Sequence, residues 1–303
     1  MKRGPLASGR QEWPRITLVT PSFNQGRFLE ETIRSVLDQA YPNLEYMVFD
    51  GGSDDGSIGL LERYSGRLAH WESQRDQGQS HAIEKGMARA TGEIVNWLNS
   101  DDLLLPGSLH RVAAVYRETG ADLFVGEDDH FAENPANSIR RFRPSGYEFP
   151  GCLRFWTGEF RYHQPCTFFT LEIYQKVGGI DRSLRYLMDY DLYCRMLAER
   201  GVRVVCVPEA ISAFRLHPGS KTERAKADFL KEQRDVSRRY WEAGGLVARE
   251  ETPAMDMYSA RCTAYQAASA LRRRDVLGSV RSLGNAIGYA VKSLLGLRLG
   301  RPR

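Results

Sequence analysis

Two adjacent carboxylates, Asp101 and Asp102, follow the apolar segment Ile94–Leu98 almost directly. Neighbouring carboxylates are costly unless solvent or a cation neutralises them. Mg²⁺ prefers one or two carboxylates together with the phosphates of a substrate. The pair therefore indicates a divalent-cation site for a phosphorylated ligand. The alternative is structural, because Asp is also a favoured N-cap residue and the pair could simply begin a helix.

A second acidic group, Asp189 and Asp191, opens a segment with helical character, residues 189–200. Residues two apart on a helix do not share a face. If the segment is helical, we therefore expect Asp191 to cap the helix or form a structural ion pair, which leaves Asp189 as the candidate for chemistry. An N-cap role for Asp189 is the competing interpretation.

The elements that must position these groups alternate between strand and helix in the first hundred residues. Strands are expected at 16–20, 44–49, 69–72 and 94–98, with helices between them. Such alternation is typical of a largely parallel sheet covered by helices on both faces. Ligands of these sheets bind at the carboxyl ends of the strands. Three polar segments fall at such ends: 21–24, 50–55 and 99–102.

Beyond Asp102 the alternation loosens. We expect a helix at 107–119, a short strand at 121–126, an irregular excursion at 128–160, a helix at 189–200 and a strand at 202–207. The organisation predicted from this pattern is a polar extension (1–14), an α/β domain (15–220, divided at residue 105) and a basic helical region (221–303).

Composition excludes several classes of protein. The 303 residues are 42% hydrophobic and 26% charged, a normal globular mix. The five cysteines form no CxxC pair, which speaks against a zinc ribbon or a disulfide framework and favours a reducing, cytoplasmic compartment. No secretory signal and no membrane-spanning apolar run are evident.

The net charge of +4 is unevenly distributed. Residues 221–303 contain 17 basic and 9 acidic side chains, so residues 1–220 carry a net charge of −4. A net acidic motif region disfavours a nucleic-acid binder. The basic, partly apolar segment 272–303 could instead contact an anionic bilayer peripherally, although an ordinary docking helix fits it equally well.

The motifs, taken in order, resemble glycosyltransferase family 2, the inverting enzymes with a GT-A fold. The resemblance covers about residues 16–220, and Met188 stands where many members have Glu. It is carried by these segments: Thr20–Gly26, Asp50–Ser57, Asp76–Ser80, Asn99–Asp102, Gln164-Pro165, Val177–Asp181, Met188–Leu192 and Arg215–Ser220.

The resemblance implies a role for each motif. Asp102 and His217 are expected to hold Mg²⁺ or Mn²⁺ in a DxD-type site, and Asp189 to deprotonate the acceptor hydroxyl. Phe23 is expected to stack on the base, although a core position is its alternative. The expected donor-binding residues are Pro21, Ser22, Phe23, Asn24, Asp50, Gly78, Ser80, Ser100, Asp101 and Arg215.

The implied reaction is transfer of a sugar from a nucleoside-diphosphate sugar, with UDP as first choice, to a carbohydrate or lipid-linked acceptor. One base with no separate nucleophile implies inversion. The expected setting is polysaccharide or glycoconjugate assembly in the cytoplasm or at the inner membrane face. The alternative is a catalytically silent binding protein with the same fold. No P-loop or GxGxxG motif supports a kinase or an NAD enzyme.

Overall fold

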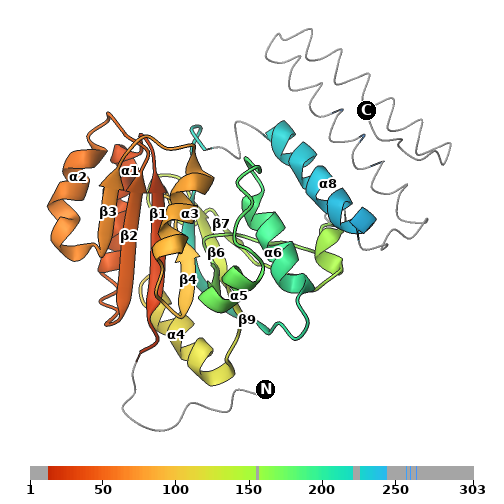
Figure 1. The fold of residues 1–303 in the computed structure, drawn as a ribbon. Helices are drawn as coiled ribbons and strands as arrows, with labels where there is room; N and C mark the ends of the chain where they lie inside the picture. The colour runs from red at the N-terminus through yellow and green to blue at the C-terminus, as the bar shows by residue number, and fades with distance from the viewer. Residues whose placement is uncertain are drawn as a thin grey trace. The chain divides into compact units, whose positions relative to one another are not determined.

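The computed structural model describes residues 13–154, 157–220 and 226–243, together with three single positions farther along. The chain forms two compact units (Figure 1). The larger unit comprises residues 1–149 and 161–217, and the smaller one comprises residues 150–160 and 218–303. Most of the predicted polar extension and most of the predicted basic tail lie outside the described residues, including the segment 272–303 that was interpreted either as a membrane contact or as a docking helix.

A mixed sheet forms the centre of the larger unit, in the order β3-β2-β1-β4-β8-β6-β9-β5, with β7 paired to β6. Parallel pairs join β3 to β2, β2 to β1, β1 to β4 and β6 to β9, whereas the other pairs are antiparallel. The strands are β1 (Ile16–Ser22), β2 (Leu44–Asp50), β3 (His70–Ser73), β4 (Ile94–Trp97), β5 (Leu103–Leu104), β6 (Leu123–Phe131), β7 (Arg140–Phe142), β8 (Thr167–Thr170) and β9 (Val204–Arg215).

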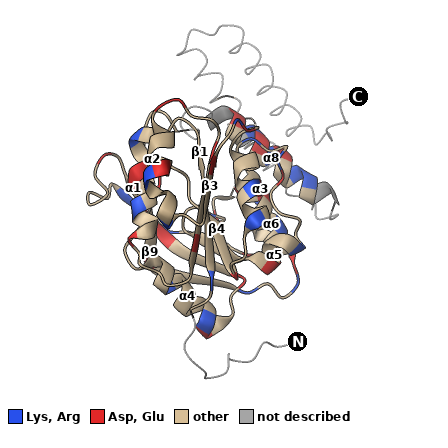
Figure 2. Cartoon of the chain, turned by 60° about the vertical axis from the view of Figure 1, so that its left-hand side comes forward, with Lys and Arg blue, Asp and Glu red and all other residues tan. Residues whose placement is uncertain are grey.

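Helices cover both faces of this sheet (Figure 1). Their bounds are α1 (Gly26–Leu37), α2 (Ser57–Tyr64), α3 (Gln79–Arg89), α4 (Ser108–Thr119), α5 (Leu171–Lys176) and α6 (Met188–Ala198). In Figure 2 most charged residues lie on the helices and connecting loops, while the strands are mainly uncharged.

The period-two alternation of β1 explains the two layers. Ile16 and Leu18 join the apolar cluster that contains Leu29 of α1 and Val112 of α4. Val19 points the other way, where α3 packs against β1 and β2. Both faces of β1 are therefore buried, as expected for a central strand of a parallel sheet.

The prediction of strands and helices in residues 16–98 is confirmed to within a few residues. The interpretation of 128–160 as irregular from its start is wrong, because β6 continues to Phe131 and β7 pairs with it. The acidic residues Glu127–Asp129 concealed this strand in the sequence. They are tolerated there because their partners come from other strands.

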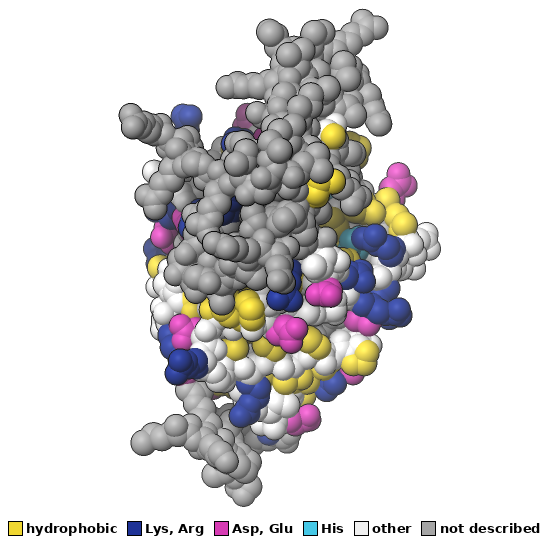
Figure 3. All heavy atoms as spheres, turned by 90° about the vertical axis from the view of Figure 1, so that its right-hand side faces the viewer, with side chains coloured by type: hydrophobic (Ala, Val, Ile, Leu, Met, Phe, Trp, Pro, Cys, Tyr) yellow, Lys and Arg dark blue, Asp and Glu magenta, His cyan; other side chains and the backbone are white. Residues whose placement is uncertain are grey.

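The smaller unit includes the short helix η2 (Gly151–Leu153) and the helix α8 (Lys226–Ala243), which contact each other. Cys152, Leu153 and Val236 are buried. Among the helices that the structure describes, none is long and apolar enough to span a bilayer. Acidic and basic side chains are interspersed with hydrophobic ones on the face shown in Figure 3.

Candidate functional site

The carboxyl ends of β1, β2 and β4 meet at one edge of the sheet. Ser22 lies opposite Asp50 in the parallel register, and Gly51 N donates a 2.8 Å hydrogen bond to Ser22 O. Leu98 N similarly donates to Val19 O, 2.9 Å away. The order β2-β1-β4 places the reversal of strand order at β1, which is where open α/β sheets bind ligands.

Asp50 stabilises the loop that follows β2. Its Oδ2 atom accepts hydrogen bonds from Gly52 N, Ser53 N and Ser73 Oγ at 2.7–3.1 Å. Its Oδ1 atom accepts one from Ser53 Oγ, at 2.6 Å. Since a carboxylate oxygen can accept more than one bond, Oδ1 keeps capacity for a ligand.

The segment after β1 exposes an aromatic ring beside this loop. Phe23 is 60% exposed, which excludes the core position considered as its alternative. A Cβ atom on Gly51 would come within 3.2 Å of the Phe23 ring, so the glycine lets the ring lie close to the β2 loop. Asn24 follows at a positive φ of 51° and accepts a 3.1 Å hydrogen bond from Asp54 N.

The other two residues at the end of β1 are buried. Pro21 is paired in register with Phe49. The buried Ser22 hydroxyl has no hydrogen-bond partner within the described part of the chain. The Asp55 carboxylate accepts hydrogen bonds from Ser57 N and from Gly26 N, 29 residues earlier, so it connects the loop after β2 to the beginning of α1.

Gly78 and Ser80 stand at the beginning of α3. Gly78 adopts a φ of 104°, and its N–H donates to Asp76 Oδ1 at 2.7 Å. The Ser80 hydroxyl contacts Met188 Sδ at 2.8 Å, 108 residues farther along the chain. This contact brings the beginning of α3 beside the first turn of α6, which carries Asp189.

Asp102 is a buried carboxylate among other negative charges. It is 1% exposed. Burial raises its pKa well above the usual value, and Asp101 and Asp128 raise it further. Hydrogen bonds from Arg215 N (3.1 Å) and Asn99 Nδ2 (3.2 Å) offset part of this effect. The unbalanced negative charge makes the position receptive to a cation.

Asp101 meets His217 across the chain. The Nε2 atom of His217 lies 2.9 Å from Asp101 Oδ2. The backbone N–H of Arg215, two residues earlier, donates to Asp102, so the end of β9 contacts both carboxylates. Ser100 lies buried beside them. Carboxylates are ligands that suit both Mg²⁺ and Mn²⁺, so Asp101 and Asp102 fit the cation that the motif implies.

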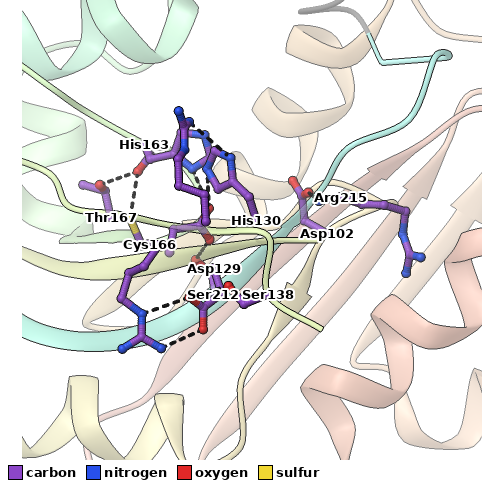
Figure 4. Close-up of polar contacts among 12 residues, drawn as sticks. Asp102, Asp129, His130, Ser138, His163, Cys166, Thr167, Ser212 and Arg215 are labelled. Carbon is purple, nitrogen blue, oxygen red and sulfur yellow. Dashed lines mark hydrogen bonds and ion pairs between the residues drawn. The ribbon is translucent and has the colours of Figure 1, made fainter. Parts of the chain in front are cut away.

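The Arg215 side chain occupies an enclosed position next to Asp102 (Figure 4). Its guanidinium lies 4.6 Å from the Phe28 ring centroid and 4.5 Å from that of Phe131. It donates to Asp101 O and forms an ion pair with Glu31. These contacts hold the loop that bears His217, and contact with a diphosphate remains a prediction.

Asp189 is half-buried in the first turn of α6. It stands one residue beyond Met188, and Leu187 is the N-cap residue, so Asp189 does not take the N-cap position that was its alternative. Asp191 forms the structural pair expected of it, because its Oδ2 atom accepts two bonds from Arg195 at 2.7 and 2.9 Å.

Sequence reasoning missed several residues of this region. Glu31 pairs with Arg215 from α1, and Phe28 packs on both Arg215 and His217. Asp128 acts on Asp102 from β6. Only Asp128 carried a signal in the sequence, as part of the acidic run 127–129, and that run lay in the segment expected to be irregular.

A family model described as glycosyl transferase family 2 matches residues 17–178, more than half of the chain. An uncharacterised glycosyltransferase of Rickettsia typhi is 25% identical over 216 residues, which cover 70% of this chain and 67% of that protein. A GalNAc(5)-diNAcBac-PP-undecaprenol beta-1,3-glucosyltransferase of Campylobacter jejuni is 29% identical over 139 residues, 45% of this chain and 44% of that protein.

Solved structures share the fold. TarS of Staphylococcus aureus in complex with UDP-GlcNAc superposes with a TM-score of 0.60 at 14% identity, covering 93% of this chain and 92% of that one. A mannosyltransferase of Pyrobaculum calidifontis in complex with GDP-Man and Mn²⁺ gives a TM-score of 0.53 at 19% identity, covering 97% and 90%. The expected GT-A type fold is thereby confirmed.

Proposed function

The chain belongs to glycosyltransferase family 2, and we propose on that premise that it transfers a sugar from a nucleoside-diphosphate sugar to an acceptor hydroxyl, with inversion and with help from a divalent cation. The observation that carries this proposal is the adjacent pair of the partly exposed Asp101 and the buried Asp102, which His217 and the backbone of Arg215 contact.

The donor fits the polar edge formed by β1, β2 and β4. Phe23 would stack on the base, since an exposed ring beside a loop can cover a planar ligand. Asp50 Oδ1 and the Ser22 hydroxyl have hydrogen-bonding capacity for the base or ribose. One solved neighbour, TarS, was crystallised both with UDP-GlcNAc and with UDP, which supports UDP as the first nucleotide to test.

Asp102 and His217 would hold the cation, with Asp101 beside them. The bound cation would supply Lewis-acid stabilisation of the departing diphosphate. Arg215 would keep this loop in place through its contacts with Glu31 and Phe28, and we propose in addition that it contacts the diphosphate.

Asp189 would accept the proton of the acceptor hydroxyl. It stands beside the beginning of α3, because Met188 contacts Ser80. Direct displacement with one base gives inversion at the anomeric carbon, whereas retention by covalent catalysis needs a second nucleophilic step. We propose a carbohydrate or lipid-linked sugar as acceptor, in line with relatives from teichuronic acid and undecaprenol-linked glycan synthesis.

Hydrolysis of nucleotide sugars tests the proposal without knowledge of the acceptor. UDP-, GDP- and dTDP-sugars are incubated with the full chain and Mn²⁺, Mg²⁺ or EDTA, and release of the nucleoside diphosphate is measured. We expect one donor class to be hydrolysed only with metal. Asp102→Asn should reduce the rate at least about 100-fold, which corresponds to about 2.7 kcal/mol.

Asp38→Asn is the matched control, because Asp38 pairs with Arg34 at the exposed end of α1 and lies at none of the motifs. It should hydrolyse the donor like the wild type. Metal-dependent donor binding without hydrolysis would indicate that the acceptor is required. Absence of any donor binding would overturn the transferase proposal and favour a silent binding protein.

A further inference from the structure

Three polar atoms of the larger unit converge in its interior without hydrogen-bond partners among the described residues: Asp128 Oδ2, His130 Nε2 and His163 Nδ1. His163 Nδ1 lies 2.9 Å and His130 Nε2 lies 3.4 Å from Asp128 Oδ2, yet neither pair has the geometry of a hydrogen bond. All three atoms lie within 4.8 Å of one another. Unsatisfied polar groups are expensive in a protein interior, so their convergence requires an explanation.

The alternation of β6 creates this cluster. Glu127 and Asp129 share one face of the strand, and both carboxylates pair with Arg141 of β7, at 3.8 Å and 2.8 Å. Asp128 and His130 share the opposite face. From β7, a long contact of 3.4 Å from Arg140 reaches His130. The carboxylate of Asp128 is completely buried and accepts one bond, from Ser212 of β9, through its other oxygen.

Aromatic rings enclose the histidines. The Phe142 ring lies 5.9 Å from the His130 ring and 4.9 Å from the His163 ring, and Phe214 lies 5.3 and 4.8 Å from the same rings. A neutral imidazole has a lone pair available for a metal ion.

We propose that Asp128, His130 and His163 form a binding site for a transition-metal ion of the Zn²⁺ class. Figure 4 shows His130 and His163 directed toward the same point. Ligand atoms about 2.0–2.1 Å from a tetrahedral zinc ion lie about 3.3 Å apart, close to the two distances in the cluster. Two imidazoles and one carboxylate are a frequent ligand set for zinc and for related divalent ions.

This site is separate from the proposed cation site of the transferase. The cluster consists of Asp128, His130 and His163. The hydrogen bonds described above join Asp102 to Arg215 and His217 to Asp101 instead. The two sites are electrostatic neighbours, since Asp128 raises the pKa of Asp102. An ion at Asp128 would compensate that charge without taking part in the transfer.

Among the described residues, Arg140 makes a contact with His130 that metal binding would disturb. Its Nη2 atom lies 3.4 Å from His130 Nδ1, on the side away from the cluster, and its side chain is exposed. A metal-bound His130 would carry its proton on Nδ1, so Arg140 must turn into solvent. Replacement of Arg140 by Gln should therefore strengthen metal binding.

Titration of the EDTA-treated full chain with Co²⁺ and then Zn²⁺, without nucleotide, tests the site. We expect one equivalent of Co²⁺ with the intense visible absorption of a four-coordinate, nitrogen-containing site, displaced by one equivalent of Zn²⁺. His163→Gln and Asp128→Asn should weaken binding at least tenfold, and Zn²⁺ should raise the Tm of the wild type but not of His163→Gln.

The controls separate this site from the transferase site and from misfolding. Asp102→Asn and His110→Gln should keep the absorption, since His110 packs on Trp13 and Tyr41 far from the cluster in sequence. His163 is half-buried, so its variant should fold even where Asp128→Asn does not. Absence of the signal in the wild type, or an unchanged signal in folded His163→Gln, would overturn the proposal, whatever the transferase assay shows.

Discussion

His217 Nε2 lies 2.9 Å from Asp101 Oδ2, although 116 residues separate the two in the chain. The antiparallel pairing of β5 with β9 produces this contact, because β5 begins directly after Asp101-Asp102 and β9 ends two residues before His217. The Arg215 N–H bond to Asp102 fixes the same arrangement. The candidate cation site is therefore assembled by strand pairing in the second half of the sheet.

His217→Ala should weaken the apparent affinity for Mn²⁺ in the presence of the donor nucleotide at least tenfold, because it removes one proposed ligand and the partner of Asp101. Metal titration of donor hydrolysis measures the effect. His110→Gln serves as the control. Equal metal affinity in His217→Ala and the wild type would remove His217 from the site.

Phe23→Ala should weaken binding of the donor nucleotide about tenfold, since stacking between a base and an aromatic ring contributes about 1–3 kcal/mol. The Tm should stay unchanged, because the ring is 60% exposed. Phe23→Trp should retain affinity, and Ile139→Ala, at a position 62% exposed, provides the control for loss of surface area. Calorimetric titration with UDP distinguishes the variants.

Asp189→Asn should lower kcat about 10²–10⁴-fold while the Kd for the donor remains constant, as expected on loss of a general base. Asp191→Asn provides the contrast. Its buried carboxylate pairs with Arg195, so this variant should lose about 3 kcal/mol of stability instead. A large fall in donor affinity for Asp189→Asn would contradict the assignment.

Gly86→Ala should lower the free energy of unfolding by about 2 kcal/mol. A Cβ atom there would lie 2.4 Å from Val19 Cγ1, where α3 crosses β1. Val19→Ala in the same chain should relieve the overlap, and a double-mutant cycle in urea measures the coupling. Gly59→Ala, whose Cβ would have no neighbour within 4 Å, should stabilise α2 by about 1 kcal/mol.

Glu45→Gln should lower the free energy of unfolding by about 2 kcal/mol at neutral pH. Although burial raises the pKa of Glu45, hydrogen bonds from Thr17 and Thr91 and the Arg15 charge outweigh it, so the pKa is lowered on folding. Its stabilisation is therefore complete above the ordinary glutamate pKa and is lost as the pH falls through the folded value. The difference in the free energy of unfolding between Glu45→Gln and the wild type, measured by urea denaturation at several pH values, should therefore shrink in acid. The control Glu62→Gln, at an exposed position, should change the free energy of unfolding little at any pH. A pH-independent difference would contradict this.

The sequence by itself determined the first half of the fold. Strand and helix alternate with periods that local hydrophobicity makes visible, so β1, β2 and β4 and the polar segments at their ends could be predicted. The order of the motifs indicated the family. Because Asp189 and Asp191 are two residues apart on a helix, Asp191 could be predicted to have a structural role, and its pair with Arg195 confirms this.

Only the tertiary structure decided how the second half completes the site. β6 pairs with β7, β8 and β9, and arginines in and just after β7 balance the charges of Glu127 and Asp129, which no local pattern of residues 127–129 reveals. The enclosure of Arg215 by Phe28 and Glu31, and the convergence of Asp128 with His130 and His163, likewise join distant segments. Burial and charge compensation arise from contacts between segments far apart in the chain. They therefore depend on how the strands assemble into the sheet, which local sequence patterns do not show.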